Sequence, residues 1–416
     1  MAWMQGPGGI SAALAASVAI HWSRPSNGAG RTYDGGYRAD GPVRTLPPAT
    51  TAPMKISLVM ISTGLGGVQQ SLVPYALALK KRGHQLQILV SGRARSMVDL
   101  LVERGLGGQV EKLEGIWKLH RYLPHAGLRE RVRGFAPDLV LGFAQMGFIE
   151  AHRALRGSGI PVLTRVGTMK SKRMGRFRNA DGWLATTAEM KTALKARGFD
   201  EERIFIVPNF LAENSPEPEE NSSQPGERDL RHPPRVGSLG RFVARKGFGV
   251  LIDAVDLLRE RGVELECTIA GDGKDLDTMK ARIDERGLSR IVHLPGWLGH
   301  GDKAEFLQGL DLFVCSSLDE PFGFVYLDAM RFGLPVVTTP TVGARFIFSD
   351  TDTACWTPFE DPASLADAIQ RLLSDESRRA ALGRQSRQLY ATAFSLEAGS
   401  RNLDLALGQM RGLGKR

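Results

Sequence analysis

The chain has 416 residues, of which 42% are hydrophobic and 24% are charged, and it carries a formal net charge of +9. This length is too great for one ordinary domain, and this composition excludes an intrinsically disordered chain or an integral membrane protein. The positive charge indicates an anionic partner, which could be nucleic acid, an acidic membrane or an acidic substrate.

Residues 1–53 differ in composition from the rest of the chain. Residues 8–20 are small and apolar but too few to span a membrane, and residues 22–53 are rich in Gly, Pro, Arg and Thr without periodicity. A buried strand is predicted directly after Met54. We interpret 1–53 as a disordered extension or a misassigned start, with a targeting segment as the alternative.

Short β-rich runs alternate with amphipathic helical runs after Met54. The pattern predicts helices at 71–82 and 188–197 and strands at 55–61, 85–91, 138–143, 161–166, 183–186 and 203–207. Such alternation predicts a Rossmann-like domain with a parallel sheet over 54–212. The acidic, proline-rich run that follows, 213–234, is predicted to be an interdomain linker.

The alternation starts again after this linker. The pattern predicts helices at 362–373 and 376–410 and strands at 235–239, 264–270, 291–294, 311–315, 335–338 and 354–357. A second Rossmann-like domain is therefore expected over 235–390, and the helical segment 391–416 could pack back on the first domain. The predicted fold class is α/β, with two Rossmann-like domains facing across a cleft that binds the ligand.

A loop that could bind phosphate follows the first strand of each predicted domain. In the first domain, Gly66 and Gly67 allow close approach of the backbone to a ligand before a helix begins. The full GxGxxG spacing is absent, so an ordinary strand–helix turn is the alternative. In the second domain, Gly240 precedes Arg241 and Lys246, which could both face a diphosphate. A solvated basic loop is the alternative there.

Two further blocks follow later strands of the second domain. Gly271, Asp272 and Gly273 form a predicted tight turn after 264–270. After 311–315, Glu320 precedes a turn and a helix that carries Asp328 on its second turn. The N–H groups at the start of this helix could face a diphosphate, and they belong to Gly323, Phe324 and Val325.

Taken together, these blocks resemble the family 4 retaining glycosyltransferases of the GT-B fold, the bacterial group 1 glycosyltransferases. There an Arg-x4-Lys pair, a Gly-Asp-Gly turn and a Glu-Pro-Phe-Gly-x4-Glu block recur in this order. The continuation at 329–337 and Val207-Pro208-Asn209 also match. The resemblance covers the chain from Met54 onward and is strongest over 235–340.

This resemblance implies a role for each matching residue. The expected catalytic residues are Arg241 and Lys246, which would bind the donor diphosphate, and Glu320, which would contact the donor sugar. Asp328 stands where the family has a second glutamate that binds ribose. Gly66 and Gly67 would lie near the phosphate and the acceptor. No metal or other cofactor is expected, and a UDP-sugar is the expected donor.

Two positions depart from the family pattern, and one stretch spells a metal-binding motif. Gly167 stands where a histidine usually contacts the donor sugar, and Phe346 stands where a glutamate is usual. Asp350-Thr351-Asp352 has the DxD spelling of metal-dependent transferases, but it precedes a predicted strand. We therefore do not assign a metal to it.

The stretch 165–178 contains six basic residues and no acid, namely Arg165, Lys170, Lys172, Arg173, Arg176 and Arg178. By the resemblance it borders the acceptor. Lys170, Lys172 and Arg173 are expected to contact an anionic acceptor or an acidic membrane, with a solvated loop as the alternative. Nucleic acid is not expected, because no aromatic side chains form a stacking platform here.

The sequence therefore predicts a cytoplasmic glycosyltransferase, peripheral on the inner face of the cytoplasmic membrane. It would move a hexose from a nucleotide diphosphate sugar to a cell-envelope saccharide or lipid acceptor, with retention of configuration and without a metal. The alternatives are a nucleotide-sugar epimerase of similar fold and a non-catalytic subunit that binds a nucleotide sugar.

Overall fold

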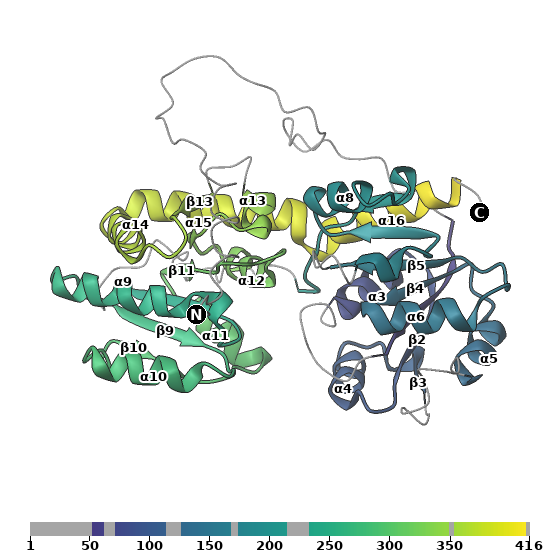
Figure 1. The fold of residues 1–416 in the computed structure, drawn as a ribbon, viewed down its shortest axis with the longest axis horizontal. Helices are drawn as coiled ribbons and strands as arrows, with labels where there is room; N and C mark the ends of the chain where they lie inside the picture. The colour runs from purple at the N-terminus through teal and green to yellow at the C-terminus, as the bar shows by residue number, and fades with distance from the viewer. Residues whose placement is uncertain are drawn as a thin grey trace, which may run out of the picture. The chain divides into compact units, whose positions relative to one another are not determined.

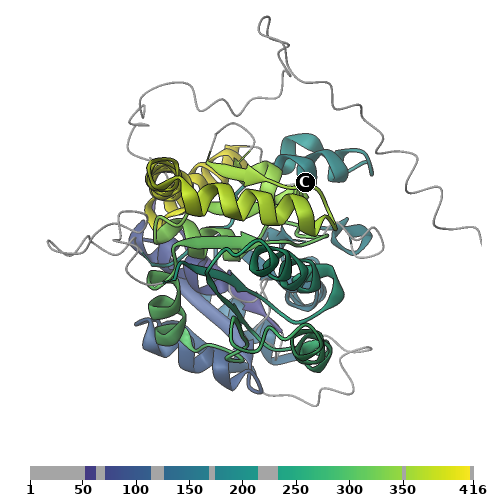
Figure 2. The same cartoon turned by 90° about the vertical axis from the view of Figure 1, so that its left-hand side faces the viewer.

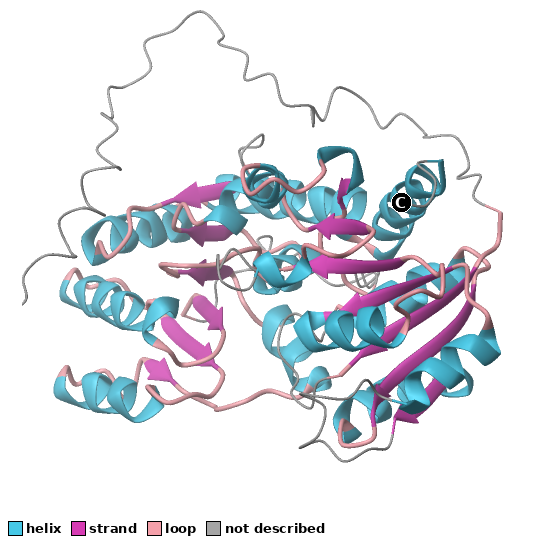
Figure 3. Cartoon of the chain, turned by 45° about the vertical axis from the view of Figure 1, so that its right-hand side comes forward, coloured by secondary structure: helices cyan, strands magenta, loops and turns pink. Residues whose placement is uncertain are grey.

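A computed structural model describes residues 52–61, 71–113, 126–167, 174–213, 233–348 and 353–412. The predicted extension lies almost entirely outside these residues, as does most of the predicted linker. Within the described residues the chain forms two parallel sheets with helices on both faces (Figure 3). The α/β fold class with two Rossmann-like sheets is confirmed.

The first sheet has the strand order β3-β2-β1-β4-β5-β6-β7. Its strands are β1 (Lys55–Met60), β2 (Gln85–Ser91), β3 (Val110–Leu113), β4 (Leu139–Phe143), β5 (Val162–Val166), β6 (Gly182–Ala185) and β7 (Ile204–Ile206). The central strands are buried on both faces, so their sequences are almost continuously apolar. Strand β3 was not predicted, because at the sheet edge only Leu113 of its four residues is buried.

Helices cover both faces of this first sheet. One face is packed by α3 (Leu72–Lys81), α4 (Arg95–Glu103) and α16 (Leu396–Gly412). The other is packed by α5 (Ala126–Phe135), α6 (Ala144–Ala154) and α8 (Ala188–Lys195).

The second sheet has the strand order β10-β9-β8-β11-β12-β13. Its strands are β8 (Arg235–Leu239), β9 (Glu266–Ala270), β10 (Val292–His293), β11 (Leu312–Cys315), β12 (Val336–Thr338) and β13 (Ala354–Trp356). One face is packed by α9 (Phe248–Glu260), α10 (Leu276–Glu285) and α14 (Pro362–Ser374). The other is packed by α11 (His300–Gln308), α12 (Phe324–Arg331) and α13 (Val342–Phe348), and Figure 2 shows helices on both sides of these strands.

The prediction of one continuous helix over 376–410 is wrong. Helix α15 (Glu376–Leu389) runs into a π-helical turn over Tyr390–Phe394, and Ser395 is extended before α16 begins. This break brings two backbone groups from near residue 212 into contact. Leu211 N donates to Phe394 O at 3.1 Å, and the Tyr390 hydroxyl donates to Glu213 O at 2.5 Å.

The C-terminal helix α16 packs against α3, the first helix of the first sheet that the structure describes. Leu403, Ala406 and Leu407 enter the core beside β1 and β2, and the Lys81 ammonium lies 2.6 Å from the Glu397 carboxylate. Figure 1 shows this yellow helix among the purple and teal elements of the first sheet. The first sheet therefore draws part of its core from the last residues of the chain.

Replacing Leu403 with alanine is expected to lower the free energy of unfolding by about 3 kcal/mol, because the buried side chain leaves a cavity. Leu405→Ala on the same helix is the matched control, since Leu405 is 44% exposed. Urea unfolding followed by circular dichroism measures both. Equal effects of the two substitutions would show that α16 is not part of this core.

No helix of the described residues is both long and apolar enough to cross a lipid bilayer.

Candidate functional site

The three motifs of the second sheet follow β8, β9 and β11, at the carboxyl ends of these strands. The strand order reverses between β8 and β11, because β9 lies on the outer side of β8 and β12 on the outer side of β11. Ligands of doubly wound sheets bind at such a point. The fold therefore gathers the second-domain motifs at one edge of one sheet.

The loop after β8 is fastened to the loop after β11. Leu318 N donates to Arg245 O at 2.8 Å, and the Ser316 hydroxyl donates to Gly247 O at 2.9 Å. Gly247 is in the left-handed conformation with φ +65°, and a Cβ there would lie 2.1 Å from Ser316 O. Glycine is therefore required where these two loops cross.

This crossing places Lys246 against Glu320. The Lys246 ammonium donates to the Glu320 carboxylate, and the two side chains are only 10% and 12% exposed. Removing two charges from water costs free energy that their mutual attraction must offset. Lys246, expected at the donor diphosphate, and Glu320, expected at the donor sugar, thus neutralise each other in this structure.

Arg241, in the same loop, is exposed. In the part of the chain that the structure describes, no carboxylate forms an ion pair with its guanidinium. An exposed guanidinium beside a glycine-rich edge can bind phosphate oxygens in a bidentate manner. Arg241 is therefore a cation available to an anionic ligand without breaking an existing pair.

The turn after β9 lies directly against the loop after β8. Gly240 N donates to Ala270 O at 3.0 Å, and Phe242 N donates to Asp272 O at 2.9 Å. Gly271 has φ +144°, and a Cβ there would lie 1.8 Å from Gly240 O. The Asp272 carboxylate accepts from Gly273 N at 2.7 Å, so it shapes the turn.

Helix α12 begins where the sequence predicted, at Phe324, with Gly323 as the residue before it in the left-handed region. The first N–H groups of any helix lack intrahelical acceptors, and those of Phe324 and Val325 are at this end. A Cβ on Gly323 would lie 2.4 Å from the Tyr326 ring and 3.0 Å from Cγ of Glu320. The turn thus brings the helix end and Glu320 together.

Asp328 is buried on the second turn of α12 and has a partner that the sequence did not indicate. Lys303 of α11 donates to Asp328 Oδ1 at 2.8 Å. The two residues are 25 positions apart, and no sequence motif includes both of them, so only the fold reveals the pair.

The position that departs from the family pattern, Phe346, lies on α13 beside the same edge. Its ring centroid is 6.0 Å from that of Phe322, in a tilted contact. Gly343 N on the same helix donates to Glu320 O at 2.8 Å. At this position the chain has an apolar contact that supports the Glu320 turn in place of a carboxylate.

Arg165 does not belong to a basic loop, and that expectation is wrong. It lies in β5 and is 2% exposed, because it shares the strand face of Leu163 that packs beneath α3. Its guanidinium donates to the Asn209 side chain, and burial lowers the pKa of Arg165. Asn209, of the matching Val-Pro-Asn block, is therefore a core partner of this arginine.

Several predicted positions lie outside the described residues. These are Gly66, Gly67, Lys170, Lys172, Arg173 and the Asp350–Asp352 motif. Gly167, just after β5, is the last described residue before one of these gaps.

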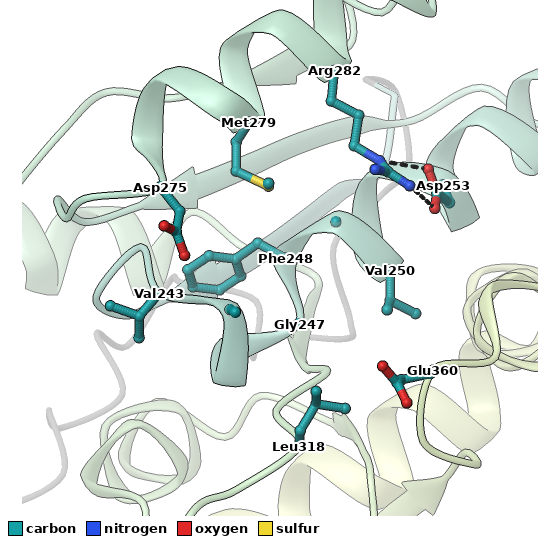
Figure 4. Close-up of a pocket in the computed structure, with 12 residues that line it drawn as sticks. Val243, Gly247, Phe248, Val250, Asp253, Asp275, Met279, Arg282, Leu318 and Glu360 are labelled. Atoms are coloured by element: carbon teal, nitrogen blue, oxygen red, sulfur yellow. Dashed lines mark hydrogen bonds and ion pairs between the residues drawn. The ribbon is translucent and has the colours of Figure 1, made fainter. Parts of the chain in front are cut away.

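A hollow of about 260 Å³ adjoins the loop after β8 (Figure 4). It is lined by the start of α9, by α10 and by Leu318 and Glu360, with the Asp253–Arg282 ion pair on its wall. The side chains of Arg241, Lys246 and Glu320 do not line it. The hollow is therefore separate from the surface that carries these three groups.

Comparison with known proteins gives two family matches. Residues 222–389 match the model described as glycosyl transferases group 1, and residues 65–213 match the model described as glycosyltransferase family 4. Each Rossmann-like half of the chain is thus matched by a separate model.

Individual relatives extend over most of the chain. The chain described here is 28% identical to the lipopolysaccharide core biosynthesis glycosyltransferase LpsE of Rhizobium meliloti (strain 1021), over 80% of its own length and 93% of the relative. It is 27% identical to LpsD of the same strain, over 83% and 95%. The structure of Anabaena HepE in complex with UDP and glucose superposes with a TM-score of 0.70 at 19% identity, over 85% of this chain and 99% of that one.

Proposed function

Because the chain belongs to the group 1 glycosyltransferases of the GT-B fold, we propose that it transfers a hexose from a nucleotide diphosphate sugar, with a UDP-sugar as the donor, to a cell-envelope saccharide or glycolipid. The lipopolysaccharide core transferases among its relatives support the acceptor class. The UDP bound to HepE supports the donor class.

The observation that carries the proposal is the group of charges at the point where the second sheet reverses its strand order. Arg241 is exposed without an ion-pair partner among the described residues, and Lys246 is held against Glu320 at the same edge. A nucleotide diphosphate leaving group gains negative charge as the sugar–phosphate bond breaks. Two cations and a helix start at this edge stabilise that charge electrostatically.

In this proposal the donor diphosphate competes with Glu320 for Lys246. As the ammonium turns toward the phosphates, the Glu320 carboxylate is released to accept hydrogen bonds from the sugar hydroxyls. The cationic groups would supply the charge that a divalent metal supplies in other transferases, so we propose transfer without a metal. The proposal of retained configuration rests on the family resemblance alone. Anomeric analysis of the product by NMR and activity in the presence of EDTA test these two points.

Replacing Arg241 with methionine is expected to weaken nucleotide diphosphate binding by about tenfold to a hundredfold, since charge-assisted hydrogen bonds to phosphate are lost. Calorimetric titration with UDP, GDP, ADP and dTDP measures the affinity. Release of the nucleotide diphosphate from the corresponding nucleotide-diphosphate hexose, with isolated lipopolysaccharide as the acceptor, measures transfer. Arg261→Met is the matched control, because Arg261, at the end of α9, pairs with Asp367 of α14. If no nucleotide binds to the unmodified protein, the proposed function is wrong.

We further propose that the protein works in the cytoplasm at the inner face of the cytoplasmic membrane, where a glycolipid acceptor is available. Lys170, Lys172 and Arg173 supply the contact with acidic headgroups. Replacement of all three by alanine is expected to abolish salt-sensitive binding to vesicles containing anionic phospholipid, measured by sedimentation. Undiminished binding by this variant would remove the membrane contact from the proposal.

A further inference from the structure

The loop between β11 and α12, residues 316–323, carries Glu320 and is held by hydrogen bonds to its main-chain oxygens. Glu320 O accepts from Gly343 N of α13 at 2.8 Å, and Asp319 O accepts from Arg245 Nη1 at 3.0 Å. The Gly343 donor is a main-chain group, whereas Arg245 is an exposed residue that reaches across from the loop after β8. The function proposed above gives this arginine no role.

Arg245 and Lys246 are neighbours in sequence, and they hold neighbouring residues of this loop through different groups. Lys246 pairs with the side-chain carboxylate of Glu320, and Arg245 donates to the main-chain oxygen of Asp319. Leu318 N donates in return to Arg245 O at 2.8 Å, so both the main chain and the guanidinium of Arg245 are bonded to the loop. The attachment through Arg245 therefore does not depend on the ion pair between Lys246 and Glu320.

We propose that Arg245 is a positioning residue that holds Glu320 in place while Lys246 is bound to the donor. This inference rests on the proposed function, in which the donor diphosphate competes with Glu320 for Lys246. Once the ammonium has turned to the phosphates, the Glu320 carboxylate has lost its ion pair. The hydrogen bond from Arg245 to Asp319 O, one residue earlier, then limits movement of the main chain that carries this carboxylate.

The expected effect of losing this bond is on turnover and not on donor affinity. A hydrogen bond from a charged donor is stronger than one between neutral groups, so the guanidinium is an effective restraint on the loop. A displacement of about 1 Å at a reacting group can lower turnover about a hundredfold. The Arg245 guanidinium donates to the protein and is not proposed to touch the donor, so its removal leaves the diphosphate contacts intact.

Replacing Arg245 with methionine is expected to lower kcat for sugar transfer by about tenfold or more, because Glu320 is then poorly placed. The Kd of the nucleotide diphosphate and the KM of the donor are expected to change by less than about twofold. Initial rates and calorimetric titration measure these quantities. Arg245→Lys keeps a charged donor and is expected to recover most of kcat. Arg290→Met, at an exposed arginine between α10 and β10, is the matched control and is expected to change nothing.

Hydrogen exchange of the loop tests the restraint without any ligand. Lys246→Met removes the ion pair with Glu320 and leaves the bond from Arg245 in place. In that background Arg245→Met is expected to raise the exchange rate of the amides of 316–323 about tenfold, against less than about twofold when Lys246 is present. Mass spectrometry of peptides from the loop measures the rates. If Lys246→Met unfolds, the double variant Lys246→Met with Glu320→Gln replaces it as the background.

The outcomes separate the inference from the function on which it rests. If the unmodified protein binds no nucleotide diphosphate, the proposed function itself fails. If it binds one and Arg245→Met keeps full kcat, the positioning role is wrong while the function stands. If Arg245→Met weakens nucleotide binding as much as it lowers kcat, Arg245 contacts the donor directly, and positioning is overturned. Equal effects on exchange in the two backgrounds, or no recovery of kcat in Arg245→Lys, would also overturn it.

Discussion

Replacing Glu320 with glutamine is expected to lower kcat for sugar transfer by at least about a hundredfold, because a neutral amide at the sugar cannot replace the carboxylate in a preorganised charged site. The substitution also leaves the Lys246 ammonium, 10% exposed, without its counter-charge. This loss is expected to cost about 3 kcal/mol of unfolding free energy. Initial rates and thermal unfolding measure the two effects separately.

The double variant Lys246→Met with Glu320→Gln distinguishes stability from activity. Removing both charges leaves no uncompensated ion, so the double variant is expected to be more stable than either single variant and equally inactive. Glu305→Gln, an exposed glutamate of α11, is the control and is expected to match the unmodified protein. Full activity of Glu320→Gln would mean that this carboxylate has no part in transfer.

Replacing Gly271 with alanine is expected to cost at least about 4 kcal/mol, since the substitution combines backbone strain with a collision. Its φ of +144° is unfavourable for a side chain, and the new Cβ would lie 1.8 Å from Gly240 O. Relief of this contact must move the loop that carries Arg241, so nucleotide binding is expected to be lost as well. Chemical denaturation and calorimetric titration measure the two losses.

Gly262 provides the matched control for this substitution. It also has a positive φ, +72°, but no atom lies within 4 Å of the position of its Cβ. Gly262→Ala is therefore expected to cost only the backbone strain, about 1–2 kcal/mol, and to leave nucleotide binding unchanged. Equal stability of the two alanine variants would show that the contact between Gly271 and Gly240 does not hold the site together.

The sheet strands could be predicted because most of them are buried on both faces and have almost continuous apolar sequences. Strand β3 could not, since its edge position leaves two of its four residues half-buried and one exposed. The break at Tyr390–Phe394 could not be predicted either. It depends on hydrogen bonds to Leu211 and Glu213, about 180 positions earlier, which no local pattern records.

The residues of the site could be predicted better than their contacts. Glycines, cations and acids at strand ends predict a phosphate-binding edge, and those of the second domain do follow β8, β9 and β11. Their partners depend on the fold: Lys246 contacts Glu320 rather than solvent, and Lys303 contacts Asp328. Arg165 was counted with the basic stretch 165–178 although it also lies in the predicted strand 161–166, and its place in the alternation of β5 decides its burial.

The packing of α16 on α3 has a consequence for the order of folding during synthesis. Domains usually fold as they leave the ribosome, in order from the N-terminus. Here the core beneath α3 includes Leu403, Ala406 and Leu407, which are made after the whole second sheet. The first sheet to be translated therefore completes its core last, and a nascent chain that stops before residue 403 lacks the α16 side chains of the core on the α3 side of that sheet.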